Sequence, residues 1–147
     1  QSAELHIWRG IIKSTYAGVK GGLGALKYAK EAKVDLEKAL ELDAGALQGS
    51  AYTSLGTLYF NVPGWPVAFG DDEKAEELLK TALTINPDGI DPNYFYGDYL
   101  TNEKRYADAK VHMEKALEAA PRIGRELADD GRRKEIQQAL LDIEKRL

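Results

Sequence analysis

The segment that decides the fold is residues 90–121, which read IDPNYFYGDYLTNEKRYADAKVHMEKALEAAP. Four of its positions repeat positions that lie 34 residues earlier in the chain: Ala75 and Ala109, Leu79 and Met113, Ala82 and Ala116, and Pro87 and Pro121. The three apolar positions of each copy are spaced i, i+4 and i+7, which places them on one face of a helix. The proline then ends that helix, because it has no amide donor and clashes with the preceding turn.

A second helix precedes this one in each copy. Its aligned positions are Tyr52 with Asn93, Leu55 with Tyr96, Gly56 with Gly97, and Tyr59 with Leu100. The step between them is 41 residues, which exceeds 34 by seven. The first copy therefore carries a seven-residue insertion between its two helices, within Asn61–Asp72. The glycines predict that two helices cross closely, because a larger side chain would hold them apart.

Shorter matches lie on both sides of these two copies. Ala32, Leu36 and Ala39 stand 43 residues before the equivalent positions of the first copy, and the helix expected before them, at about 5–19, lacks the Leu-Gly pair. A last helix is expected at about 132–146, where apolar residues form one stripe: Ile136, Leu140, Ile143 and Leu147. The sequence therefore predicts an all-α fold of about seven helices, namely three pairs and one terminal helix.

Composition excludes several classes of function. Hydrophobic residues make up 44% of the chain, charged residues 30%, and the net charge is −4, so no basic face for nucleic acid is expected. The chain has no cysteine, which excludes disulfides, thiolate metal sites and thiol nucleophiles. His6 and His112 have no partner at metal-ligand spacing. We therefore expect no metal, no cofactor, no membrane-spanning segment and no enzyme.

The repeated positions resemble the tetratricopeptide-repeat (TPR) family over roughly residues 20–121. The chain departs from the family where Tyr52 and Asn93 stand in place of a frequent tryptophan, and where Leu79 and Met113 stand in place of a frequent aromatic residue. The resemblance implies a right-handed solenoid of antiparallel helix pairs with a C-terminal capping helix, in one domain. The expected parts are a degenerate first pair at 4–44, a second repeat at 49–87 with its insertion at 61–72, a third repeat at 90–121 and a capping segment at 122–147.

The resemblance also implies a non-catalytic scaffold that binds a protein or peptide on its concave face, which the first helix of each pair lines. The residues expected to be exposed there are Thr53, Thr57, Phe60 and Asn61 in the second repeat, and Tyr94, Asp98, Thr101 and Asn102 in the third. Asn61 and Asn102 resemble in location the asparagines with which the family clamps extended peptides. The alternative is that this face is only solvated, or is covered by the terminal helix.

The insertion is the most unusual segment, because it holds two prolines, two glycines and two aromatic residues. Long loops with their own aromatic residues are often functional, so Trp65 is a further candidate for ligand binding. In the alternative interpretation, Trp65 and Phe69 fold back and plug the end of the helix pair.

A narrower resemblance rests on residues 49–60, on the Pro-Gly-Trp-Pro stretch at 63–66 and on Phe69-Gly70-Asp71. These segments look like bacterial envelope repeat proteins, some of which are associated with tripartite ATP-independent periplasmic (TRAP) transporters. The resemblance implies a periplasmic protein, after removal of a signal peptide, that partners a solute receptor or binds a small solute. It favours the periplasm over the cytoplasm, and both stay open, as does a homodimer.

Several local features have definite expected roles. The glycines between 18 and 24 predict a turn within the first helix pair. Ser50, Asp71 and Asp91 are expected to cap helices, since each precedes a helical pattern. Four arginines between 122 and 133 alternate with acidic residues, which predicts a solvated, salt-bridged segment.

Overall fold

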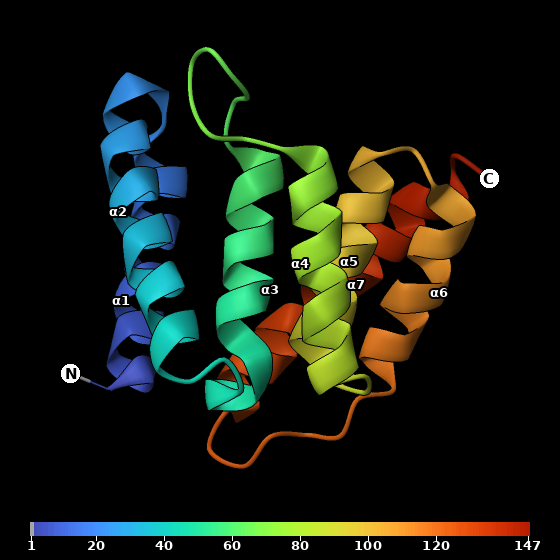
Figure 1. Cartoon of the computed structure of the whole chain (residues 1–147). Helices are drawn as coiled ribbons and strands as arrows, with labels where there is room; N and C mark the ends of the chain where they lie inside the picture. Colours follow the sequence, from blue (N-terminus) through green and yellow to red (C-terminus); the bar gives the residue numbers. More distant parts are fainter. Residues whose placement is uncertain (1) are drawn as a thin grey trace. The chain divides into compact units, whose positions relative to one another are not determined.

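The computed structural model describes residues 2–147, and within them the chain forms seven α-helices and no β-strand (Figure 1). The prediction of an all-α fold is confirmed. The helices are α1 (Ala3–Lys20), α2 (Gly22–Leu42), α3 (Ala46–Asn61), α4 (Asp72–Ile85), α5 (Ile90–Asn102), α6 (Tyr106–Leu117) and α7 (Glu126–Glu144). None of the helices in residues 2–147 combines the length and the apolar character needed to cross a bilayer.

The chain divides into two compact units, of which the first ends at Ile85 and the second begins at Asn86. In the first unit, α1 pairs with α2 and α3 pairs with α4, each pair antiparallel, while α3 also packs on α1 and α2 (Figure 1). In the second unit, α5 pairs with α6, and α7 packs on both. Adjacent helices thus pack as pairs within each unit, as in a helical repeat.

In the core of the first unit, a large side chain of one helix packs against a glycine of the helix paired with it. Leu36 and Leu79 are fully buried. A side chain at Gly10 would lie 2.7 Å from Leu36 Cγ, and one at Gly56 would lie 2.8 Å from Leu79 Cγ. Each glycine therefore lets a leucine of the paired helix approach its backbone.

The second unit buries Leu100 and Met113 from the helix pair, and Ile136 and Ile143 from α7. The apolar stripe expected on the last helix is thus its packed face. These contacts bury apolar surface, which is the main favourable term in folding.

Asn93 occupies the position of the frequent family tryptophan and is fully buried in the second unit. Its side-chain amide donates to the carbonyl oxygens of Pro87 and Gly89, both at 2.9 Å. Its Oδ1 lies 3.0 Å from Nδ1 of His112, and the ring of His112 packs edge-on against Tyr96. A buried amide needs such partners, so Asn93 joins the start of α5 to α6 by hydrogen bonds instead of by bulk.

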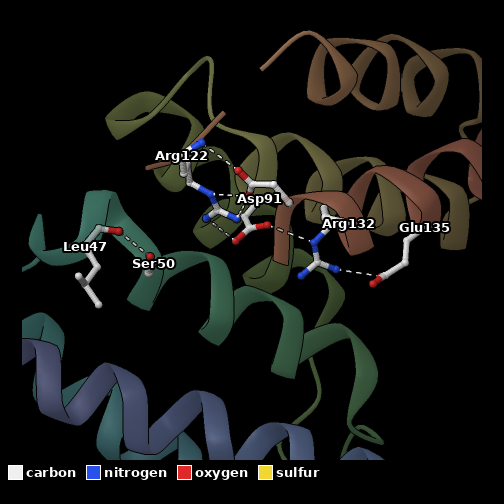
Figure 2. A network of polar contacts seen from close by, with 7 residues as sticks. Leu47, Ser50, Asp91, Arg122, Arg132 and Glu135 are labelled. Atoms are coloured by element: carbon white, nitrogen blue, oxygen red, sulfur yellow. Dashed lines mark hydrogen bonds and ion pairs between the residues drawn. The ribbon is translucent and has the colours of Figure 1, made fainter. Parts of the chain in front are cut away.

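The turn and capping predictions have mixed outcomes. Gly21, with φ at +64°, separates α1 from α2, as the glycine run predicts. Asp71 accepts a hydrogen bond from the amide of Lys74 at 3.0 Å and so caps α4. Ser50 follows three residues in left-handed conformation, 47–49, but its hydroxyl donates to the carbonyl of Leu47 instead of accepting an amide hydrogen bond (Figure 2). The expectation for Ser50 was wrong in that respect.

Candidate functional site

The expected binding residues of α3 are only partly accessible. Thr53 is buried, so the prediction that it is exposed was wrong. The reason is that α3 packs against three other helices of its unit, which leaves it little free surface. Thr57 and Phe60 are half-buried and Asn61 is exposed.

The polar groups of this row are already hydrogen-bonded within α3. The hydroxyl of Thr57 donates to the carbonyl of Thr53 at 2.8 Å, and Asn61 Nδ2 donates to the carbonyl of Thr57 at 3.0 Å. Asn61 is the last residue of α3, and its carboxamide oxygen is the group left to accept a bond from a ligand.

The loop between α3 and α4 has a defined backbone structure. The amides of Val67 and Ala68 both donate to the carbonyl of Gly64, and the amide of Gly70 donates to the carbonyl of Pro63 at 2.9 Å. A Cβ at Gly70 would lie 1.9 Å from the carbonyl oxygen of Val62, so only glycine fits there. The loop is therefore held in one shape by its own main chain.

The two aromatic residues of this loop lie in opposite environments. Phe69 packs edge-on against the buried Tyr59, with ring centres 5.4 Å apart, and Lys33 of α2 lies 5.7 Å from its ring. Trp65 keeps 90% of its surface exposed. The interpretation that both residues plug the helix pair is thus right for Phe69 and wrong for Trp65.

In the second unit, α7 covers part of the face that α5 was expected to offer to a ligand. The guanidinium carbon of Arg132 lies 4.5 Å from the ring centre of Tyr94 and 4.6 Å from that of Phe95. Arg132 Nε also donates to Asp91 Oδ1 at 3.1 Å, and its Nη1 donates to Glu135 Oε2 at 2.9 Å (Figure 2). At Tyr94, the terminal helix α7 therefore covers the face that was expected to bind a ligand, as the alternative interpretation states.

Burial and nearby charge change the titration of two groups on this face. Burial raises the pKa of the Tyr94 phenol to about 12, and the charges of Asp98 and Glu135 reinforce the shift. Burial also raises the pKa of Asp98 above its ordinary value, against the lowering effect of Arg132. Asp98 is thus a half-buried carboxylate with one acidic neighbour, Glu135, and one cation, Arg132, both on α7.

Asp91 does not cap α5, because the residue before the helix is Gly89 and no side chain caps it. Its carboxylate instead joins two arginines, Arg122 Nη1 at 3.2 Å and Arg132 Nε at 3.1 Å (Figure 2). Arg122 in turn binds Asp129, which is buried. The expectation that this arginine segment is salt-bridged is confirmed, but the expectation that it is solvated was wrong, because a partly buried network fixes the segment against α5.

The remaining expected residues lie at the end of α5. Asn102 is exposed and is the last residue of its helix, as Asn61 is in α3. Thr101 is half-buried and donates to the carbonyl of Gly97 at 2.9 Å. It also lines a shallow hollow with three residues from the end of the chain: Asp142, Lys145 and Arg146.

The roles of Arg132 and Glu135 at this face were not predicted. One sequence signal points to them: the two residues are three apart and so lie on the same face of α7. Within residues 2–147, no cluster of three or more histidine, cysteine or acidic side chains has a geometry that would hold a metal ion.

The comparisons with known proteins agree with the helix pair of the second unit. Residues 90–123, which contain α5 and α6, match the model of the tetratricopeptide repeat. No curated protein sequence matches the chain. Residues 90–123 are therefore similar to a tetratricopeptide repeat, which is the repeat expected at that place in the sequence.

Proposed function

We propose that the chain is a non-catalytic scaffold that binds a protein or peptide partner, with Trp65 as the main anchor on its first unit. The single observation that carries this proposal is the 90% exposure of Trp65 on a loop whose backbone is hydrogen-bonded into one shape. Tryptophan is enriched among the residues that dominate binding energy at protein interfaces. A rigid loop adds to this, because little conformational freedom is lost when the partner binds.

Neighbouring groups suit an extended peptide beside Trp65. Asn61 ends α3 at the start of the loop and offers a carbonyl oxygen to a peptide amide. Asp71 and Asp72 are exposed at the other end of the loop. A peptide with an apolar or aromatic residue near a basic one would match these groups, since the acidic side chains favour a cation close by.

The second unit offers less to a ligand than its sequence suggests. Tyr94 and Asp98 are held against Arg132 and Glu135 of α7, so a peptide would have to displace those contacts to reach them. Thr101 and Asn102 stay accessible at the end of α5 and serve as secondary contacts.

The test is selection of a displayed random-peptide library on the whole chain and on three variants. Wild type and Leu127→Ala, which changes an exposed apolar residue of the second unit, are expected to enrich the same peptide motif. Trp65→Ala is expected to enrich none. Gly70→Ala, which keeps Trp65 but displaces the loop backbone, is expected to weaken enrichment strongly. Equal enrichment on wild type and Trp65→Ala would refute the proposal.

A second candidate function is a periplasmic component of a TRAP-type transporter, or a protein that binds a small solute. The Pro-Gly-Trp-Pro loop at 63–66, with its exposed tryptophan, favours it. Cell fractionation of the source organism separates the candidates: recovery of the native protein in the cytosol eliminates the periplasmic role. Recovery in the periplasm, together with co-purification of a solute receptor that Trp65→Ala abolishes, would support it.

A further inference from the structure

Helix α1 has two apolar faces, and one of them stays largely exposed, although its Tyr16 packs edge-on against Tyr28 of α2 with ring centres 4.6 Å apart. The face turned to α2 and α3 buries Ala3, Ile7, Gly10 and Ala17. The opposite face carries five large apolar residues that stay exposed: Leu5 at 55%, Trp8 at 42%, Ile12 at 64%, Tyr16 at 49% and Val19 at 83%. At 3.6 residues per turn these five fall within an arc of about 80°, so they form one continuous stripe, here named the α1 stripe.

The α1 stripe is symmetric about Ile12. Leu5 and Val19 lie seven residues on either side of it, and Trp8 and Tyr16 lie four residues on either side. An antiparallel partner helix with the same stripe would set Leu5 against Val19, Trp8 against Tyr16 and Ile12 against itself. Such a contact is self-complementary, as a two-fold dimer interface requires.

The size of the stripe also fits a second copy of this chain. From their exposed fractions, the five side chains leave roughly 500 Å² of apolar surface open, which is at the upper end of patches found on monomers. Two copies would together bury at most about 1,000 Å², which is the lower limit of a specific interface. The Trp8–Tyr16 pairs would add aromatic contacts at both ends of the helix crossing.

Two of the cations beside the stripe, Arg9 and Lys13, are neutralised within the chain. Lys13 Nζ lies 2.8 Å from Asp35 Oδ2 and 3.5 Å from Glu31, and Arg9 Nη2 lies 3.5 Å from Asp35 Oδ1. Two identical basic flanks can therefore approach each other without a large repulsion. The same pairing weakens the attraction of the stripe for an anionic membrane, because Arg9 and Lys13 are compensated and Lys20 lies over the rings of Tyr16 and Tyr28.

From the symmetry, the area and the balanced charges together, we propose that the chain forms an antiparallel homodimer through the α1 stripe. This interface is separate from the peptide-binding surface at Trp65.

The first test is sedimentation velocity of the whole chain over a range of concentrations. Wild type and Val34→Glu, which changes an exposed valine of α2 outside the stripe, are expected to show twice the mass of one chain. Ile12→Glu, checked for folding by circular dichroism, is expected to be a monomer because it sets two carboxylates together at the two-fold axis.

The antiparallel orientation of the two α1 helices is tested by disulfide cross-linking. The chain has no native cysteine, so only the introduced cysteines can form disulfides. A mixture of Leu5→Cys and Val19→Cys chains is expected to form mainly the mixed disulfide under mild oxidation. Disulfides between identical chains in place of the mixed one would indicate a parallel pair and overturn the proposal. A wild type that stays monomeric at every concentration would overturn it too, as would a dimer that tolerates Ile12→Glu. A monomer that sediments with phosphatidylglycerol vesicles would assign the stripe to a lipid surface instead.

Discussion

Two nitrogens of the Arg122 guanidinium group donate to the same carboxylate oxygen of Asp129, Nε at 2.8 Å and Nη2 at 2.5 Å. The other oxygen of Asp129 accepts the backbone amide of Arg122 at 2.9 Å. Asp129 is therefore buried with both oxygens satisfied, and it fixes the segment between α6 and α7. The hydrogen bonds from Arg122 lower the pKa of Asp129, although burial alone would raise it.

Removal of this carboxylate should destabilise the chain. We expect Asp129→Ala to lower the free energy of unfolding by about 3 kcal/mol, because it leaves the Arg122 amide without its partner and the guanidinium with only its longer contact to Asp91. Urea denaturation followed by circular dichroism measures the loss. Asp130→Ala is the matched control, since Asp130 is exposed and its change should stay within about 0.5 kcal/mol. Equal effects of the two substitutions would contradict the structure.

Glycine-to-alanine substitutions should have effects that differ in sign with the space at each site. Gly131→Ala in α7 meets nothing within 4 Å and should stabilise by about 1 kcal/mol through helix propensity. Gly56→Ala brings Cβ to 2.8 Å from Leu79 Cγ and 3.2 Å from the carbonyl of Ala75, and should destabilise by about 1–2 kcal/mol net. In Gly97→Ala the three nearest contacts of the new Cβ lie in the flexible side chain of Met113, at 3.1–3.2 Å, and the change should be nearly neutral.

Unfolding midpoints in urea rank these three variants. The order Gly131→Ala, Gly97→Ala, Gly56→Ala from most to least stable is the expected result. A Gly56→Ala variant as stable as Gly131→Ala would show that α3 and α4 do not approach as closely as described.

Asp98 is held at a cost to stability. Because burial raises its pKa, the folded chain binds its proton more tightly than the unfolded chain does. Its contribution is thus favourable below the unfolded pKa and is lost as the pH rises through the folded value. We expect Asp98→Asn to raise stability at pH 7 and to leave it nearly unchanged at pH 4. The same substitution should lower the pKa of Tyr94 from about 12, since it removes a nearby negative charge. Denaturation at the two pH values and NMR titration of the tyrosine ring test both effects.

His112 should make stability depend on pH in the opposite direction. Burial lowers its pKa below the ordinary value of about 6.5, so the unfolded chain binds the proton more readily. Its contribution is present above the unfolded pKa and is lost as the pH falls through the folded value. The decline in stability from pH 7.5 to pH 5 should therefore be smaller in His112→Gln than in wild type. Identical pH profiles for the two proteins would exclude this role for His112.

The helix pairs could be predicted from the sequence because their signals are local and repeated. Gly56 and Leu79 mark a close crossing, and Pro87 marks the end of a helix, through residue types that each position requires. The burial of Thr53 could not be predicted in this way. It depends on how many neighbours α3 has, and the periodicity of α3 alone does not contain that information.

The network around Asp91 was missed for a related reason. Asp91 stands before a proline and so matches a helix-capping pattern, but its partners Arg122 and Arg132 come from 31 and 41 residues further along the chain. Sequence spacing does not show ion pairs of that range. Trp65 and Phe69 differ similarly: only the path of the loop backbone decides which aromatic ring turns inward.

The measurement that tests the central claim most directly is fluorine-19 NMR of the chain labelled with 5-fluorotryptophan. The chain has two tryptophans, Trp8 in the α1 stripe and Trp65 in the loop, so a Trp8→Phe variant assigns both signals. During titration with the selected peptide, we expect the Trp65 signal to shift to saturation while the Trp8 signal stays in place. Saturable binding of the peptide with an unchanged Trp65 signal would contradict the account, because the partner would then bind elsewhere.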